Sequence, residues 1–361
     1  QRLARRALPP ADRRGRPAAP PSVTDPLGEF LDREIEEGSF PSGAALVARA
    51  DGIESAAYRG ASSGTLWDLA SLTKVLATAP LARLALREGL VWDRPIGDYL
   101  PDFKKTRFEE IRVRHLATHT SGLPAWRPLY AFGFGASAYR QALAALEPES
   151  RPGAAVVYSD LGTLVFGEIL EAVLTETLDR AFARAVAGPA ASGAAFGPLP
   201  EPDRAAPTER GNRFEASMAE KLGIRFDAFR TEVIRGEVHD GNAWGRGGVA
   251  AHAGLFGTLE DVGKLARPWL EDAGEFGEDG TPDLPESRGL FWQRKRGAGS
   301  AIDAFSDSAI GHTGFTGTSV WIDRGRGRIY ALLTNRVHPD VKPIDFNAVR
   351  RRFHEVAIVF G

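Results

Sequence analysis

Two hairpin patterns near opposite ends of the chain most constrain its fold. Residues 44–58 place Asp51-Gly52 between two β-prone runs, and Asp-Gly in that setting is a strong signal for a tight β-hairpin. Residues 318–335 repeat the pattern, with TSVWID and IYALLTN on either side of RGRGR. The long region between them has helical patterns and loops but no alternating strand run. We therefore predict an α/β fold of the α+β type: an antiparallel sheet built from both chain ends, flanked by helices, with an inserted, mostly α-helical subdomain.

Apolar stripes at helical spacing support the same division of the chain. One stripe precedes the first hairpin and another follows the second, at Leu27, Phe30, Leu31 and Ile35 and at Phe346, Val349, Phe353 and Val356. We predict one domain over residues 23–361. Its sheet subdomain covers about residues 23–70 and 288–361, and its helical subdomain covers about residues 71–287.

Residues 1–22 have the composition of a flexible, basic tail rich in Pro and Arg. The stretch lacks the apolar segment of an intact signal peptide. A start at Gln1 fits an upstream export segment that has been removed, and a cytoplasmic chain fits as well, so the compartment stays open. A tether to an anionic surface is the alternative role for this tail.

Composition excludes several classes of protein. A formal net charge of −2 argues against a nucleic-acid-binding protein, which needs a basic face. No apolar run approaches the ~20 residues of a membrane-spanning helix. The chain has 0 cysteines, which excludes disulfides, thiolate zinc sites and thiol catalysis. Any chemistry must come from Ser, Thr, Tyr, His, Lys and carboxylates.

One lysine stands out in the stretch DLASLTKVLAT, because Lys74 is the only charged residue from Leu72 to Ala82. On a helix it shares a face with Ser71, three residues earlier. Apolar surroundings lower the pKa of a lysine, so Lys74 could accept a proton from the Ser71 hydroxyl near neutral pH. The alternative is structural, with Ser71 as a helix cap and a Lys74 side chain that extends to solvent.

Two further motifs follow in order along the chain. Tyr158, Ser159 and Asp160 come just before an apolar helix, and His312-Thr313-Gly314 stands at the entrance to a strand. With S-x-x-K at Ser71, these motifs resemble those of the serine β-lactamase and penicillin-binding-protein superfamily. The chain is most similar to its class C β-lactamase-like branch and, through spacers such as residues 111–124 and 236–258, to penicillin-binding-protein-4B-like and esterase-type serine hydrolases. The resemblance covers about residues 25–361 and implies the β-lactamase/DD-peptidase fold.

The resemblance also implies roles for individual residues. Ser71 would be the acylated nucleophile and Lys74 its base. Tyr158, with its pKa lowered by Lys74, would transfer a proton to the leaving group. The oxyanion hole would consist of the backbone N–H groups of Ser71 and Phe315. The resemblance implies no cofactor and no metal.

Two residues depart from the family pattern in the predicted substrate-binding set, which is Asp160, His312, Thr313 and Gly314. Asp160 stands where class C relatives have an amide, and contact with Lys74 would raise the pKa of the lysine. His312 replaces the lysine of K-T-G, so a fixed positive charge is lost. We therefore expect poor β-lactam turnover and a preference for esters or peptide-like amides.

Histidines also raise the possibility of a metal site. His115 and His119 have the i, i+4 spacing of zinc ligands on a helix, and His239, Asp240 and His252 could approach one another. The glutamate of H-E-x-x-H is missing, so a helix end and a packed loop near the site are the favoured interpretations.

The predicted function is therefore that of a serine acyl hydrolase of the DD-carboxypeptidase or carboxylesterase type. The substrate would be a small molecule or peptidoglycan-like. The alternatives are a β-lactamase and a catalytically weak penicillin-binding or sensor domain. Oligomeric state is left open.

Overall fold

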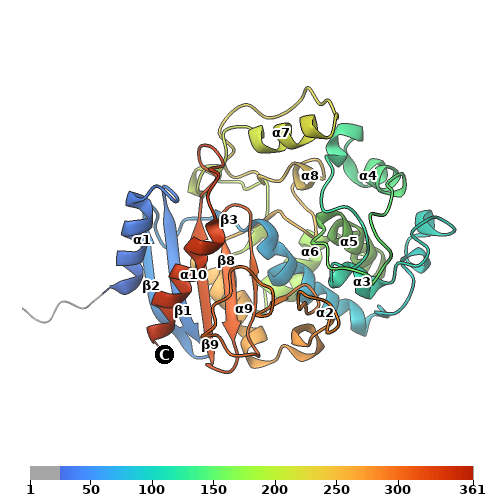
Figure 1. The fold of residues 1–361 in the computed structure, drawn as a ribbon. Helices are drawn as coiled ribbons and strands as arrows, with labels where there is room; N and C mark the ends of the chain where they lie inside the picture. The colour runs from blue at the N-terminus through green and yellow to red at the C-terminus, as the bar shows by residue number, and fades with distance from the viewer. Residues whose placement is uncertain (1–24, 361) are drawn as a thin grey trace, which may run out of the picture.

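A six-stranded antiparallel sheet forms the centre of the protein, and both ends of the chain contribute to it (Figure 1). The computed structural model describes residues 25–360, so the predicted tail lies outside the described residues. The strand order is β2-β1-β9-β8-β7-β6, which confirms the predicted fold class. The strands are β1 (Gly43–Arg49), β2 (Gly52–Arg59), β6 (Gln293–Arg294), β7 (Ile310–Thr313), β8 (Ser319–Asp323) and β9 (Arg328–Thr334).

Side chains of the central strands alternate between two cores, as expected of a sheet covered on both faces. In β1, Leu46 belongs to the larger core and Val47 to the smaller one. The smaller core lies under α1 (Pro26–Glu36) and α10 (Phe346–Ala357), which pack on each other and on the outer face of the sheet. The helix α9 (Leu259–Glu271) covers the other face against β1, β8 and β9.

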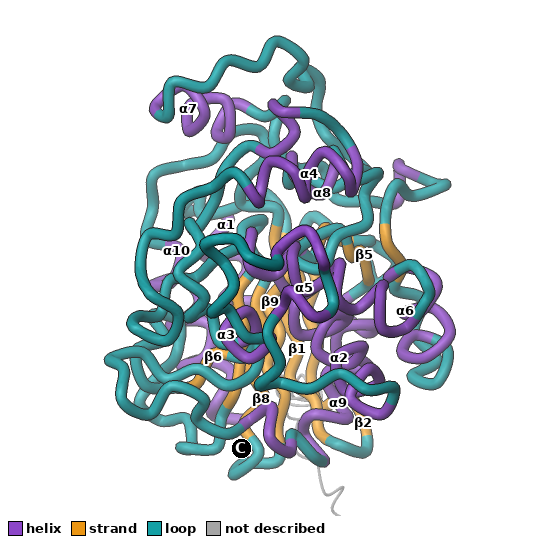
Figure 2. Tube along the Cα trace, turned by 90° about the vertical axis from the view of Figure 1, so that its right-hand side faces the viewer, coloured by secondary structure: helices purple, strands orange, loops and turns teal. Residues whose placement is uncertain are grey.

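The remaining helices and long loops lie beyond α9, on the side that faces the viewer in Figure 2. Thr313 at the end of β7 and side chains of the helical region line a common cavity. The helices are α2 (Ala79–Arg87), α3 (Val113–Ala117), α4 (Gly135–Ala144), α5 (Asp160–Leu174), α6 (Leu178–Phe182), α7 (Arg213–Lys221) and α8 (Gly241–Trp244).

A second, three-stranded sheet was not anticipated from the sequence. Its order is β3-β5-β4, from β3 (Trp67–Asp68), β5 (Leu255–Gly257) and β4 (Ala195–Phe196). The chain leaves β3 directly into the turn that carries Ser71, and Leu69 N–H donates to Leu255 C=O at 3.0 Å. This small sheet therefore anchors the entrance to the serine turn.

Within residues 25–360, no helix has both the length and the apolar character needed to cross a membrane.

Candidate active site

Ser71 lies at the start of a continuous helical run. A 3₁₀ turn (Ala70–Leu72), a π-helical segment (Lys74–Thr78) and α2 follow one another. Ala70 has φ of +47°, a left-handed conformation that costs roughly 1–2 kcal/mol in a residue with a Cβ. The Asp68 carboxylate stabilises the turn by accepting the Ala70 N–H at 2.8 Å. The strained turn leaves the Ser71 side chain half-buried at the edge of a cavity.

Lys74 is fully buried and makes three polar contacts. Its Nζ donates to Ser71 Oγ at 3.0 Å, to Asp160 Oδ1 at 2.6 Å and to the His252 C=O at 3.1 Å. The contact with Asp160 that the sequence suggested is therefore present. Burial lowers the pKa of Lys74, but the contact with Asp160, together with the nearby Tyr158, outweighs burial and raises it. The expected low pKa is thus wrong, because the pKa of Lys74 shifts in the direction that favours the ammonium form.

Tyr158 lies beside Lys74, held by the segment that leads into α5. The Ser159 hydroxyl caps α5 by accepting the Gly162 N–H at 3.0 Å, and the Ser159 N–H donates to His119 Nδ1 at 3.1 Å. The His119 and Tyr158 rings are 4.6 Å apart, and Lys74 Nζ is 4.9 Å from the Tyr158 ring centroid. The Tyr158 hydroxyl is buried and has no hydrogen-bond partner within residues 25–360.

The pKa of Tyr158 differs from the expectation. Burial of the ring raises the pKa of the phenol, and Lys74, which lowers it, does not compensate. The expected low pKa is wrong because a phenolate would be desolvated at this position.

Strand β7 brings the His-Thr-Gly element against the serine turn. The Thr316 hydroxyl donates to Asp68 C=O at 2.8 Å, and the Thr318 hydroxyl donates to Leu69 C=O at 3.1 Å. A Cβ on Gly314 would lie 2.1 Å from Thr318 Oγ1, so this approach requires glycine. Within residues 25–360, the Phe315 N–H donates to no protein acceptor.

His312 does not provide a positive charge to this site. Burial, together with the charges of Lys74 and Arg288, holds the pKa of His312 well below its usual range. Its Nδ1 contacts the Thr313 C=O at 2.8 Å. Asp160, Thr313 and Gly314 line the cavity, whereas His312 is buried and is not among the lining residues.

Arg288 provides the cation that His312 lacks, and sequence analysis missed it. The residue is only 3% exposed, and its guanidinium is 5.5 Å from the Tyr158 ring centroid. Its Nη2 pairs with Glu286 at 2.6 Å, while Nε and Nη1 have no hydrogen-bond partner in the described part of the chain. No local motif marks this arginine, because it reaches the site from a loop outside the three sequence motifs.

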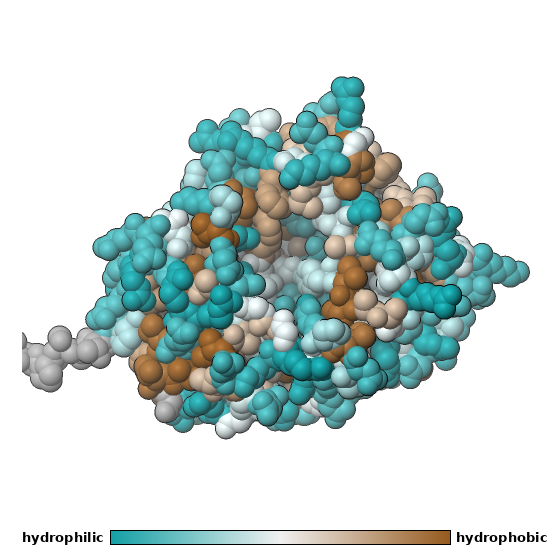
Figure 3. Space-filling view, viewed as in Figure 1, coloured by the Kyte–Doolittle hydropathy of each residue, from teal (hydrophilic) through white to brown (hydrophobic). Residues whose placement is uncertain are grey.

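The cavity at Ser71 has a volume of about 510 Å³. Figure 3 shows the surface hollowed on this face, with apolar side chains at its rim. Strand β7, the segment before α5, and α7 all contribute to the lining. Its large apolar members are Trp126, Phe214, Met218 and Phe315, and its arginines are Arg288, Arg336 and Arg350.

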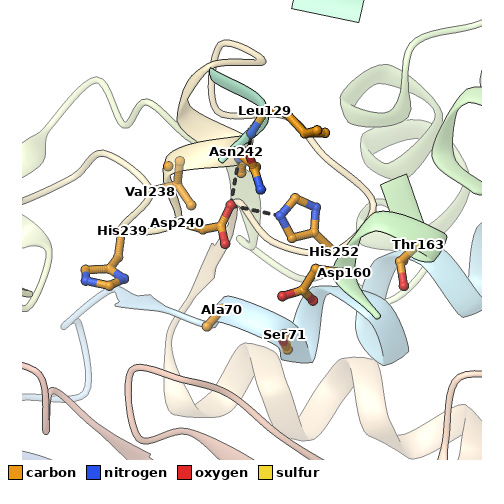
Figure 4. Close-up of polar contacts among 12 residues, drawn as sticks. Ala70, Ser71, Leu129, Asp160, Thr163, Val238, His239, Asp240, Asn242 and His252 are labelled. Atoms are coloured by element: carbon orange, nitrogen blue, oxygen red, sulfur yellow. Dashed lines mark hydrogen bonds and ion pairs between the residues drawn. The ribbon is translucent and has the colours of Figure 1, made fainter. Parts of the chain in front are cut away.

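The candidate metal ligands do not converge. Asp240 Oδ1 lies 2.8 Å from His252 Nε2, and Figure 4 shows these two facing each other while His239 points away. His239 Nε2 instead contacts Glu209 Oε2 at 2.8 Å. No group of three or more potential ligand side chains among residues 25–360 is placed to hold a metal ion.

The second candidate pair of metal ligands, His115 and His119, does not lie on one helix. Helix α3 ends at Ala117, and His119 has φ of +57° in the turn that follows. His115 and His119 therefore do not share a helical face. The favoured interpretation, a helix end that runs into a turn, is confirmed.

A half-buried serine in contact with a buried lysine, opposite the end of an antiparallel strand, characterises the serine acyl hydrolases built on the β-lactamase fold. The chain belongs to the Beta-lactamase family, whose model matches residues 27–352. It is 31% identical over 317 residues to "Putative D-alanyl-D-alanine carboxypeptidase" of Salmonella agona, a match that covers 78% of this chain and 72% of that protein. It is a hydrolase of this serine family.

Solved structures share the fold at low sequence identity. EstCE1, a hydrolase with promiscuous acyltransferase activity, superposes with a TM-score of 0.71 at 18% identity over 93% of this chain and 98% of that chain. A penicillin-binding protein homologue from Caulobacter crescentus has a TM-score of 0.71 at 19% identity over 93% and 97% of the two chains. A class C β-lactamase from Rhodobacter sphaeroides has a TM-score of 0.68 at 17% identity over 94% and 100%.

Proposed function

We propose that this protein forms an acyl-enzyme at Ser71 and cleaves peptide-like amides that end in a free carboxylate, as a DD-carboxypeptidase does. The observation that carries this proposal is Arg288, a buried guanidinium that lines the cavity with two N–H-bearing atoms unpartnered within residues 25–360. Arginine suits planar, bidentate recognition of a carboxylate. The name of the Salmonella agona relative agrees with this substrate class.

In the proposed acylation step, Ser71 Oγ attacks the scissile carbonyl carbon and its proton passes to Lys74. Because Asp160 holds Lys74 as an ammonium, the reactive form is the minority in which Lys74 is neutral, and this fraction grows with pH. The N–H groups of Ser71 and Phe315 stabilise the negative carbonyl oxygen. Tyr158 gives a proton to the leaving nitrogen as its bond to the carbonyl carbon breaks, and Lys74 restores that proton.

Deacylation runs through the same groups. Water attacks the Ser71 ester and gives up one proton to Lys74, which is neutral after it has reprotonated Tyr158. Lys74 then returns that proton to Ser71 Oγ as the bond to the acyl carbon breaks and the acid leaves. No cofactor is needed for either step. β-Lactams are expected to acylate Ser71 but to turn over poorly, because the His-Thr-Gly element has no fixed charge.

A carboxylesterase is the second candidate. The apolar part of the cavity wall, Trp126, Phe214 and Met218, fits a hydrophobic acyl or alcohol group. An ester needs neither a free carboxylate nor Arg288, so the two candidates predict different effects of the same substitution.

The first experiment maps the reaction of the full chain with a fluorophosphonate by peptide mass spectrometry. We expect a stoichiometric adduct on Ser71 that is absent in Lys74→Ala. An unlabelled folded protein would instead favour the alternative of a catalytically weak binding or sensor domain.

The second experiment compares a peptide ending in D-Ala-D-Ala with the same peptide amidated at its C-terminus. The wild type should prefer the free acid by about 10–100-fold in kcat/KM, the range of a hydrogen bond to a charged group worth about 1.5–3 kcal/mol. In Arg288→Met this preference should disappear. Turnover of p-nitrophenyl butyrate with neither peptide cleaved would identify an esterase.

A further inference from the structure

Arg350, on α10, contacts the peptide group that carries one of the two proposed oxyanion donors. The Gly314 C=O and the Phe315 N–H belong to the same planar peptide unit. Arg350 Nη2 donates to the Gly314 C=O at 2.7 Å and to the Thr318 C=O at 3.1 Å. Its Nη1 donates to Asn347 Oδ1 at 2.9 Å, which fixes the guanidinium plane.

This cation is buried and makes no direct ion pair among residues 25–360, although the charge of Asp345 acts on it from a longer distance. Arg350 is 5% exposed, and it forms no ion pair with a carboxylate among residues 25–360. Burial and the nearby charge of Arg336 lower the pKa of Arg350 to about 9. A neutral side chain could donate to the same carbonyl groups at a smaller desolvation cost, so the charge itself calls for an explanation.

A charge-assisted hydrogen bond to a carbonyl polarises the whole amide, because electron density moves toward the oxygen and the N–H becomes a stronger donor. We propose that Arg350 is a positioning residue that orients and polarises the Gly314–Phe315 peptide, so that the Phe315 N–H stabilises the oxyanion more strongly. The inference rests on the proposed function, because it needs an acyl-transfer step at Ser71.

The neighbouring arginine makes a different contact. Arg336 Nε donates to the Phe315 C=O at 2.7 Å, and that oxygen belongs to the following peptide unit. Of the two arginines, Arg350 is therefore the one hydrogen-bonded to the peptide unit that carries the Phe315 N–H. The Gly314 C=O of that unit also accepts the Gly317 N–H at 3.1 Å. Since both arginines line the cavity, the competing role for Arg350 is direct contact with a substrate carboxylate.

A neutral substrate separates the two roles. We would measure kcat and KM for p-nitrophenyl acetate, which has no carboxylate, in the wild type, Arg350→Met, Arg350→Lys and Asn347→Ala. Loss of one whole oxyanion donor costs about 10²–10³ in kcat, and weakening one donor should cost less, about 10-fold, with KM nearly unchanged. Arg350→Lys keeps the charge and should recover part of the loss, while Asn347→Ala, at a half-buried residue, should give a smaller loss of the same kind.

Arg328→Met is the matched control, because Arg328 is a buried arginine that pairs with Glu54 at the far end of β9. It should lower the melting temperature but leave kcat unchanged. Unchanged kcat for the neutral ester in Arg350→Met, or in Asn347→Ala if the former does not fold, would overturn the inference. A raised KM confined to carboxylate substrates would assign Arg350 to substrate binding instead. Failure of the proposed function would give a different result from failure of the inference alone. In that case the fluorophosphonate would not label Ser71 in the wild type, and the inference would fail as well.

Discussion

Asp160→Asn tests whether Lys74 works as a base. Asp160 Oδ1 lies 2.6 Å from Lys74 Nζ, the lysine side chain is 0% exposed and the aspartate side chain is 20% exposed. The carboxylate is therefore close enough to keep the ammonium charged despite burial, and it raises the pKa of Lys74. An asparagine keeps the shape and an acceptor oxygen but removes the charge.

The size of the effect follows from this geometry. The charge of Asp160, in direct contact with Nζ, raises the pKa of Lys74, so its removal in Asp160→Asn should lower that pKa. The fraction of neutral Lys74 at pH 7 should then rise. A less basic lysine is also a weaker proton acceptor, so the net gain in acylation rate should be roughly 10-fold.

The assay is the rate of Ser71 labelling by a fluorophosphonate between pH 6 and pH 10. The rising limb of the profile should move toward lower pH in Asp160→Asn. Asp240→Asn is the control. Asp240 lines the same cavity, but its carboxylate contacts His252 rather than Lys74, so the rising limb should move less in this variant. Slower labelling of Asp160→Asn at every pH, with the limb in place, would refute the reasoning and identify Lys74 as a fixed cation beside a Tyr158 base.

Two predictions concern stability. Burial lowers the pKa of His354 to about 3. Between pH ~6.5 and pH 3 the unfolded chain therefore binds a proton at His354 that the folded chain does not bind. The free energy of unfolding should decrease as the pH falls through this range. His354→Gln should remove about 1.4 kcal/mol per pH unit from that slope in urea unfolding at pH 4–6, and an unchanged slope would count against the assignment. Gly311→Ala would place a Cβ 2.3 Å from Cδ2 of the buried Trp321 and should cost about 1–3 kcal/mol, whereas Gly64→Ala, whose Cβ meets only Ser62 Oγ at 3.9 Å, should be nearly neutral. Equal urea midpoints for the two variants would contradict this packing argument.

The central sheet was predictable because its signals are local. Asp51-Gly52 defines one hairpin, the RGRGR turn defines another, and both form as expected. The strands of the small sheet are two or three residues long, too short for a period of two to be visible. They pair only because residues far apart in the chain meet beside the serine turn.

The close approach of Ser71, Lys74 and Tyr158 was predictable, because each belongs to a short motif. The protonation states of Lys74 and Tyr158 were not predictable from the sequence, because they depend on distances between residues that only the fold brings together. Asp160 is 86 residues from Lys74 in sequence yet in contact with it, and this contact reverses the expected direction of the pKa shift. Arg288 and Arg350 have no motif at all, so only the folded chain brings them to the cavity.

The charges near position 312 bear on the replacement of the family's lysine by His312. A lysine at position 312 would place a third cation beside Lys74 and Arg288, which already lie near the Tyr158 ring. Their charges and burial lower the pKa of His312, so the same forces would oppose an ammonium at that position. Burial, Lys74 and Arg288 together therefore favour a neutral side chain at position 312. A substrate carboxylate would be attracted toward the Arg288 end of the cavity rather than toward strand β7.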